Sequence, residues 1–310
     1  MRVSHRIPLA LLAVFAIVGA ACSNNSSTAE PGAGTSAPAT GGTVCATADM
    51  TAGDMLAKIC TSGTLRVATD PQYPPASSLD EATGKWEGFD IDTATELAKR
   101  LGVEIEWATP GWDVITAGSW SDRWDVSVGS MTITPERAQV LDFTDPYYYT
   151  PAGIAVNEAN TSITTPDDLT GKKVGVGIAT TYEQYLEGTL EIPDYPIDFQ
   201  GQGADIVTYK TDVLAIDDLA LGDCARLCAA FSAIPILQGG IDAGKPIKLV
   251  GDPIYYEPLA VAVDKSAPED DTSLVKALDD LIAAMHADGT LSASSMKWYH
   301  GIDYSLQQGG

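Results

Sequence analysis

The sequence predicts an α/β fold with two sheets of mainly parallel strands, each covered by helices. Short apolar runs typical of buried strands alternate with helical segments between residues 64 and 232. The same alternation occurs once in each half of the chain. About 265 residues follow Cys45, which is enough for two ordinary domains with their own cores. Buried strands connected through helices are typical of the parallel sheets of α/β proteins.

The first half begins with a strand and reaches its second strand through a helix. The helix carries Ile91 and Leu101 on one apolar face, and Gly102 is a typical helix stop. In chain order we expect a buried strand at 64–70, the helix at 90–102, an alternating strand at 103–108 and a further strand at 124–131.

The second half repeats this order. Thr180 and Glu183 have the spacing of a capping box, which predicts a helix that begins at this threonine. In chain order we expect a strand at 172–178, a helix at 180–188, a strand at 206–209, a helix at 212–222 and a strand at 227–232.

Another helix start is predicted at Thr134 and Pro135, directly after a strand. The threonine hydroxyl can cap a free N–H, and proline is favoured at the first helical position. Arg137 then lies in the first turn, where the free amides carry partial positive charge. A guanidinium matches a carboxylate with two parallel hydrogen bonds, so we predict carboxylate binding at Arg137. The alternative is a surface arginine that pairs with Glu136 or Asp142.

Polar residues follow the carboxyl ends of the expected strands in both halves. Asp70, Ser130 and Thr132 hold these places in the first half, and Thr180 does so in the second. Ligands of parallel sheets bind beyond these strand ends. We therefore expect both halves to face one cleft.

Residues 1–21 have the pattern of an export signal rather than of a spanning helix. Two arginines precede the apolar run at 7–18, and small residues lead to Cys22. This end resembles the lipobox of bacterial lipoproteins, in which the cysteine becomes the lipidated N-terminus, although Gly19 stands where that motif has a branched apolar residue. We expect residues 1–21 to be a signal peptide and Cys22 to be acylated with palmitate, which anchors the protein to the outer face of the cell membrane. We expect residues 22–44 to form a flexible tether.

The chain is strongly acidic, with 42 acidic and 18 basic residues and a formal net charge of −24. This balance argues against binding to nucleic acid and against electrostatic docking on anionic lipid. No second apolar run in the sequence is long enough to cross a bilayer. The acidic surface favours solubility.

Besides the acylation candidate, the chain has four cysteines. Proximity in sequence favours disulfides between Cys45 and Cys60 and between Cys224 and Cys228, although four cysteines allow three pairings. Residues four apart in a helix keep their β-carbons about 5–6 Å apart, which is too far for a disulfide. We therefore expect 222–228 to form a turn before a strand. Zinc is the alternative, but no two cysteines have the CxxC spacing, and no metal site is expected.

Neither a cofactor nor catalysis is expected. Residues 175–180, GVGIAT, follow an expected strand and approach a dinucleotide fingerprint, but Thr180 replaces its third glycine. No histidine of the sequence lies near the cleft motifs, and no nucleophile elbow occurs.

Six ordered motifs connect the cleft residues with a known family. They are TDPQYPP (69–75), GKWEGFDIDTATELAKRLG (84–102), GSMTITPER (129–137), DFTDPYY (142–148), LTGKKVGV (169–176) and LIAAMHADGTLSASSMKWY (281–299). Together they resemble the extracellular solute-binding proteins, family 3, of the polar amino-acid ABC importers, over about residues 63–303.

The resemblance implies a type II periplasmic-binding-protein fold, in which two lobes close on a solute around two hinge strands. It implies a discontinuous first lobe at 45–152 plus 258–310 and a second lobe at 153–257. The apolar strands at 153–156 and 259–263 suit the hinge crossings.

The resemblance also implies a role for each cleft residue. Arg137 clamps the α-carboxylate of the solute, and Thr132 and Ser130, which follow Gly129, offer amides and hydroxyls to the same group. Tyr73 lies over the solute side chain. The remaining implied positions are Asp70 at the cleft edge, Trp112 in the pocket wall, and Thr180 and Thr181 at a helix start of the second lobe.

The sequence departs from the family pattern where the solute's ammonium group binds. Ala233 stands where amino-acid-binding members carry an aspartate. A buried ammonium without an acid is strongly destabilised, so either Asp70 or another acid replaces this aspartate, or the solute is not a standard α-amino acid. The further departures are Cys228, Ala76, Ala179 and an atypical insertion at 191–205.

The chain is therefore expected to be the monomeric binding component of an ABC importer. It would capture a small carboxylate-bearing solute, with a polar amino acid as the first choice, and present it to a membrane permease. The alternatives are a binding protein for a non-amino organic acid, a receptor that reports the solute without transport, and a dehydratase-like enzyme on the same fold.

Overall fold

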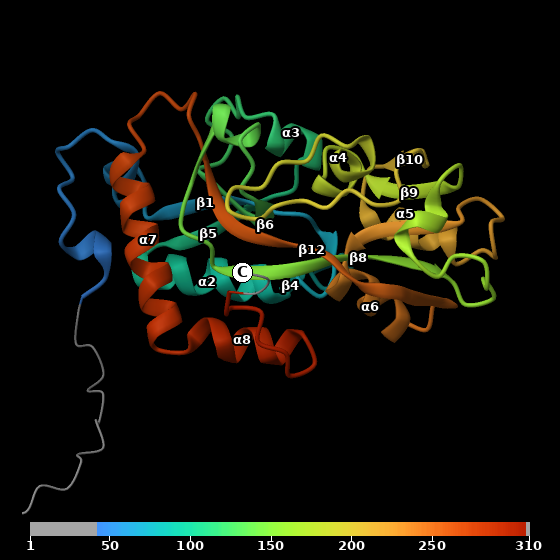
Figure 1. The fold of residues 1–310 in the computed structure, drawn as a ribbon. Coiled ribbons are helices and arrows are strands. Elements are labelled where there is room, and N and C mark those ends of the chain that lie inside the picture. Colours follow the sequence, from blue (N-terminus) through green and yellow to red (C-terminus); the bar gives the residue numbers. More distant parts are fainter. Residues whose placement is uncertain (1–41, 308–310) are drawn as a thin grey trace, which may run out of the picture. The chain divides into compact units, whose positions relative to one another are not determined.

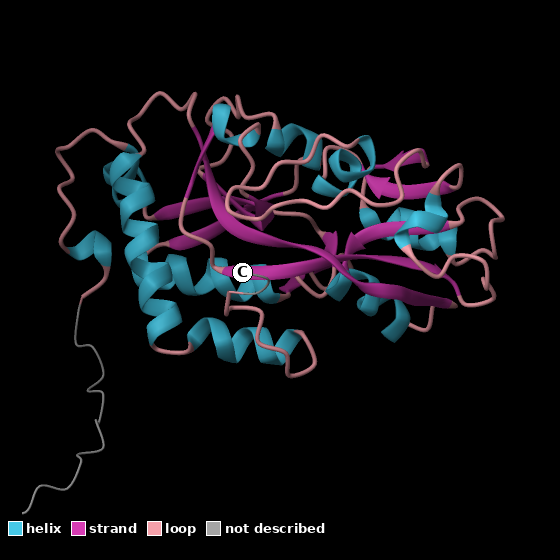
Figure 2. Cartoon of the chain, viewed as in Figure 1, coloured by secondary structure: helices cyan, strands magenta, loops and turns pink. Residues whose placement is uncertain are grey.

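The computed structural model describes residues 42–307, which form one nine-stranded sheet flanked by helices and a small second sheet (Figures 1 and 2). The nine strands are β1 (Thr64–Ala68), β5 (Glu104–Ala108), β6 (Val126–Thr132), β7 (Leu141–Phe143), β8 (Tyr148–Asn157), β9 (Lys173–Gly177), β10 (Asp205–Tyr209), β11 (Ala229–Ala233) and β12 (Ile247–Asp264). The small sheet holds β2 (Gln72–Tyr73), β3 (Ser77–Asp80) and β4 (Lys85–Glu87).

The helices cover this sheet on both of its faces. They are α1 (Met55–Ser62), α2 (Phe89–Leu101), α3 (Trp112–Thr116), α4 (Thr181–Glu187), α5 (Asp212–Leu219), α6 (Ile234–Asp242), α7 (Thr272–Ala287) and α8 (Thr290–Trp298), with short 3₁₀ segments η1 (Val44–Ala46), η2 (Arg137–Gln139) and η3 (Pro166–Leu169). None of the helices between residues 42 and 307 has the length and apolar character needed to span a membrane. The predicted signal peptide, Cys22 and the tether up to residue 41 lie outside the described residues.

Two parallel sets of strands are joined by two long antiparallel strands. β1 pairs in parallel with β5 and β6, and β9 pairs in parallel with β10 and β11. Between them, β8 and β12 pair antiparallel with each other, β11 pairs antiparallel with β8, and β6 with β12. The predicted α/β class is confirmed, but the two expected parallel sheets are two parallel sets within one continuous sheet, because β8 and β12 pair with both sets.

Each parallel set has its own hydrophobic core, and these two bodies are called the first and second lobes below. The core of the first lobe includes residues from β1, β6, α2, α7 and α8. The core of the second lobe includes residues from β9, β11, α4, α5 and α6. In Figure 1 the elements of the two lobes lie on opposite sides of the crossing of β8 and β12.

The chain crosses between the lobes in the middle of β8 and β12. Tyr148 of β8 packs in the first core and Ala152 in the second, whereas Tyr255 of β12 packs in the second and Leu259 in the first. The crossing therefore lies where Glu257 pairs with Thr150. The apolar runs at 153–156 and 259–263, expected at the crossings, instead lie just inside one core each, because apolar residues mark the buried strands and not the polar passage between them.

The expected helix at Thr134 is only one turn of 3₁₀ helix. Thr134 Oγ1 does accept a hydrogen bond of 3.2 Å from the amide of Arg137, but the residue at the N-cap of the turn is Glu136. The turn ends at Gln139, since Leu141–Phe143 continues as a strand against β12. The prediction of a helix was wrong here because the apolar residues that follow serve strand pairing instead.

Two other predicted helix ends agree with the structure, whereas the helix expected at 212–222 already ends at Leu219. Gly102 follows α2 with φ 91°, a left-handed conformation that favours glycine. Thr180 caps α4 by accepting a hydrogen bond from the amide of Glu183. The capping box is incomplete, however, since the Glu183 carboxylate accepts from the amide of Ala179.

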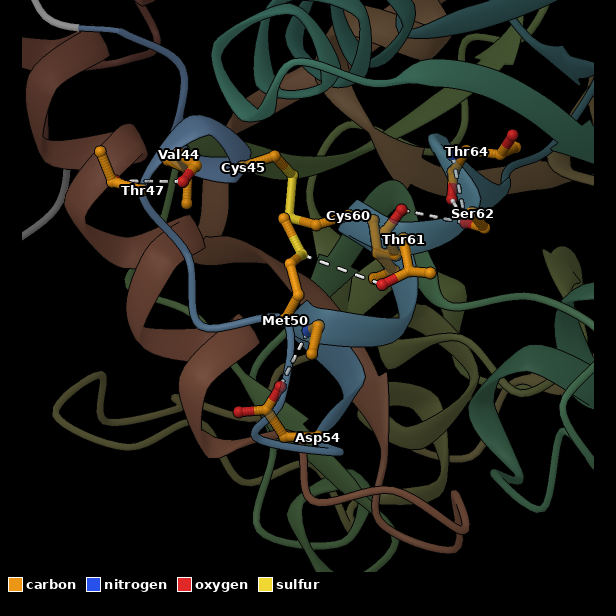
Figure 3. The surroundings of a disulfide bond; sticks show 11 residues. Val44, Cys45, Thr47, Met50, Asp54, Cys60, Thr61, Ser62 and Thr64 are labelled. Carbon is orange, nitrogen blue, oxygen red and sulfur yellow. Dashed lines mark hydrogen bonds between the residues drawn. A yellow bond between two sulfur atoms is a disulfide. The ribbon is translucent and has the colours of Figure 1, made fainter.

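The structure contains both disulfides that the spacing favours. Cys45 in η1 is bonded to Cys60 in α1 with a Cα–Cα distance of 5.2 Å (Figure 3). Cys224 is bonded to Cys228 in a turn that leads into β11. Val44, the last residue of the expected tether, already packs against the first core.

Candidate functional site

A pocket lies between the lobes at the carboxyl ends of the parallel strands. Eight of the nine predicted ligand-binding residues line it, and Thr132 does not. The first lobe contributes Asp70, Tyr73, Trp112, Gly129, Ser130 and Arg137, and the second contributes Gly177, Ile178, Thr180, Thr181, Tyr182, Lys210, Thr211 and Asp212.

Arg137 is buried in this pocket with only 5% of its surface exposed. Its Nη1 donates to the carbonyl oxygen of Thr132 at 2.9 Å, and its Nη2 donates to that of Ala179 at 3.0 Å. Burial lowers the pKa of the guanidinium, and Glu257 acts in the opposite direction. Within residues 42–307 only two of its five N–H donors have a partner, so the others remain for a ligand.

The hydroxyls of Ser130 and Thr132 are engaged within the protein. Ser130 Oγ donates to Asp90 at 2.7 Å, and the Ser130 amide donates to the hydroxyl of Tyr147 at 3.0 Å. Thr132 Oγ1 donates to Glu257 at 2.8 Å. Ser130 nevertheless lines the pocket, whereas the hydroxyl of Thr132 is held by the buried carboxylate of Glu257 and Thr132 lies outside the lining.

Glu257 links the two lobes at the point where β12 crosses between them. It is 1% exposed and accepts hydrogen bonds from Thr132 of the first lobe and from Thr181 and Tyr182 of the second. Burial raises the pKa of its carboxyl group. Sequence reasoning missed Glu257, although a lone acid in the apolar run at 254–263 was a usable signal.

Asp212 is a second functional candidate that sequence reasoning missed. It is the first residue of α5, directly beyond the carboxyl end of β10, which is the position rule that selected the other cleft residues. Its Oδ1 accepts from the amide of Gly177 at 2.8 Å, and its Oδ2 accepts from Ser232 Oγ at 2.7 Å. Burial raises the pKa of Asp212 to about 7. A Cβ at Gly177 would lie 2.5 Å from Oδ1, so glycine is what admits the carboxylate here.

Asp70 brings another carboxylate to the same pocket. It accepts a hydrogen bond of 2.7 Å from the amide of Gln72, and burial raises its pKa. Asp70 also acts to raise the pKa of Asp212, which places the two acids within electrostatic reach of each other. The pocket therefore combines a buried cation with two acids that have no ion-pair partner among the described residues.

Aromatic side chains form the walls of the pocket. The hydroxyl oxygens of Tyr73 and Tyr182 lie 3.5 Å apart, one from each lobe. Trp112 Nε1 donates to the carbonyl oxygen of Ala179 at 3.2 Å, and its ring lies 5.5 Å from the guanidinium of Arg137. These bonds between the lobes describe a closed arrangement.

The chemistry of the pocket suits binding of a small charged molecule. Across residues 42–307 no three His, Cys, Asp or Glu side chains are grouped closely enough to hold a metal ion. The residues that line the pocket include no histidine and no cysteine. Ser130 is the one serine among them, and its hydroxyl already donates to Asp90.

A family model for bacterial extracellular solute-binding proteins, family 3, matches residues 65–301. The L-cystine-binding protein TcyJ of Escherichia coli (strain K12) is 35% identical over 247 residues, which are 79% of this chain and 86% of TcyJ.

Solved structures agree with these matches. An ancestral arginine-binding protein bound to glutamine aligns with a TM-score of 0.66 and 32% identity, over 76% of this chain and 98% of the other. An ancestral amino acid-binding protein, a precursor of cyclohexadienyl dehydratase, aligns with a TM-score of 0.67 and 32% identity, over 79% and 99%. The predicted type II periplasmic-binding-protein fold is confirmed.

Proposed function

Because this chain belongs to the bacterial extracellular solute-binding proteins of family 3, we propose that it is the extracytoplasmic binding component of an ABC importer. Its solute is a small carboxylate-bearing molecule, namely a polar amino acid, which is captured between the two lobes and presented to a membrane permease. The relatives named above support an amino acid as the solute, since cystine and arginine appear in their names and glutamine in one structure.

The observation that carries this proposal is the charge pattern of the pocket. Arg137 offers unused donors to a carboxylate, and Asp70 and Asp212 offer acceptors to an ammonium group. Charged groups buried without partners are costly, and a zwitterion would satisfy both kinds at once. We assign the solute-binding role to the predicted residues that line the pocket, with Arg137 as the carboxylate clamp.

We further propose the organisation of the rest of the chain. The first lobe comprises 45–152 plus 258–310, and the second comprises 153–257. Cys22 carries the lipid that anchors a monomeric protein to the outer face of the cell membrane, and 22–44 connects it to the lobes.

Thermal-shift screening of residues 45–310 tests the function directly. The panel contains the amino acids, their decarboxylated and deaminated analogues, and small organic acids, with calorimetry on each hit. A solute at 100 times its Kd should stabilise the protein by about 2.7 kcal/mol. A thermal shift with amino acids supports the proposal, and the absence of a shift with every compound of the panel contradicts it.

Lobe closure is tested by small-angle scattering. The radius of gyration should fall when a saturating solute is added, because closure brings Ala179 against Arg137 and Trp112. A solute that binds in calorimetry without compaction would rule out closure as the capture step.

Catalysis is a second candidate function, and two observations favour it. Asp212 has a pKa raised to about 7, which suits a general acid or base, and one structural relative is a precursor of a dehydratase. Chromatography of a cyclic hydroxy acid incubated with the protein would detect dehydration. We favour binding without chemistry, because the relatives named above are binding proteins.

A further inference from the structure

Asp212 is an acid in the pocket wall whose charge has no ion-pair partner in the described part of the chain. It is 5% exposed, and no lysine, arginine or histidine among residues 42–307 lies within ion-pair distance of it. Lys210 lines the same pocket but forms no ion pair with Asp212. A buried carboxylate in this state is destabilised unless a cation arrives from outside.

The carboxylate of Asp212 is held in place and still has acceptor capacity. Gly177 donates to one of its oxygens and Ser232 to the other. A carboxylate has about four lone-pair sites, so each oxygen keeps one for a ligand. The glycine and serine therefore fix its orientation without consuming its ability to bind a donor.

The neighbouring residues leave this acid as the best placed partner for a positive group. Ala233, which follows Ser232 at the end of β11, offers only a methyl group. Asp70 is less buried than Asp212, so its charge is better solvated and gains less from a cationic partner. Asp212 belongs to the second lobe and Arg137 to the first, so a solute that carries both charges would bridge the lobes.

We propose that Asp212 binds the ammonium group of the solute and so restricts the pocket to amino acids. This assignment rests on the proposed function. Burial raises the pKa of Asp212 to about 7, with Asp70 and Glu257 acting in the same direction, so an ammonium group would compensate a charge that burial and the neighbouring acids disfavour.

The test compares two ligands on three proteins by calorimetry. The ligands are the amino acid that responds most strongly in the screen and its deaminated analogue, in which hydrogen replaces the amino group. The proteins are the wild type, Asp212→Asn and the matched variant Asp70→Asn. Asparagine keeps the shape of the side chain and removes its charge.

The expected result is a selective loss. Asp212→Asn should weaken binding of the amino acid at least 100-fold and change binding of the deaminated analogue less than 5-fold, as expected for a charge-assisted bond to one ligand group. Asp70→Asn should weaken binding of the amino acid less than Asp212→Asn does. Equal affinity of the wild type and Asp212→Asn for the amino acid would overturn the assignment and leave the proposed function intact.

Two other outcomes are also decisive. A wild type that binds only deaminated acids overturns the role of Asp212 and moves the function to organic acids. A wild type that binds neither class contradicts the proposed function itself. If Asp212→Asn does not fold, a crystal structure of the wild type with the amino acid provides the test. The solute nitrogen should lie about 3 Å from the carboxylate of Asp212. Contact of this nitrogen with another acid instead of Asp212 would refute the proposal.

Discussion

Arg137 of the first lobe donates a hydrogen bond of 3.0 Å from Nη2 to the carbonyl oxygen of Ala179 in the second lobe. The same guanidinium is the proposed clamp for the solute carboxylate. Carboxylate binding and lobe closure therefore use neighbouring donors of one buried side chain, which gives closure a direct connection to the solute.

Replacement of Arg137 should abolish solute binding without unfolding the protein. Arg137→Ala removes the cation, and we expect affinity to fall at least 100-fold, about 2.7 kcal/mol, because truncation of one partner of a buried charge pair is costly. Arg137→Lys keeps the charge without the planar fork and should give an intermediate loss. Calorimetry measures both, with circular dichroism as the folding control. Normal binding by Arg137→Ala would show that the carboxylate lies elsewhere.

Ala179 is a strained position whose relief should stabilise the protein. Its φ is 59°, a conformation that costs a residue with a Cβ roughly 1–2 kcal/mol. Ala179→Gly removes this cost but adds freedom to the unfolded chain, so we expect a net gain of about 0.5 kcal/mol in the free energy of unfolding.

The matched control is Ala243→Gly, at an exposed helix end where φ is −73°. That change relieves no strain and should lower the free energy of unfolding by about 0.5–1 kcal/mol. Urea denaturation compares the two variants. If both variants changed the free energy of unfolding in the same direction, strain at Ala179 would not be the explanation.

Asp90 should make the stability of the protein depend on pH. It is fully buried and bonded to Ser130 and Tyr147, and burial raises its pKa from 3.8 to about 7. A folded pKa above the unfolded value stabilises the protein at low pH, and this contribution is lost as pH rises from about 4 to about 7.

Relative to Asp90→Asn, the wild type should therefore lose on the order of 4 kcal/mol of unfolding free energy over that range. Urea denaturation at several pH values measures the difference between the two proteins. Curves that run parallel from pH 4 to pH 8 would show that Asp90 does not titrate in this window.

The two disulfides should stabilise the protein to different extents. The sequence separations that they close are 15 residues for Cys45–Cys60 and 4 for Cys224–Cys228. Loop-closure entropy gives about 3 kcal/mol for the first and about 2 kcal/mol for the second. Urea denaturation of the two double serine variants provides the comparison, and a larger loss for the Cys224 and Cys228 variant would contradict the entropic explanation.

Local signals in the sequence account for most of the element order. The apolar face of α2, the glycine at its end and the threonine at the start of α4 all act within a few residues of the element that they define. The turn at Arg137 was predicted as a helix because the same start signal precedes either structure. Pairing of Leu141–Phe143 with β12, more than 100 residues later, decided between them.

The sequence by itself determined the α/β class, the cleft at the strand ends and the cationic residue at its centre, because periodicity, caps and strand ends are local properties of the chain. Only the tertiary structure decided which side chains share the pocket. Glu257 receives bonds from Thr132 and Thr181, and Asp212 is bonded to Ser232 and Gly177. These partners are 20 to 125 residues apart in the chain, and their roles arise when folding removes water and leaves each buried charge to find its own partners.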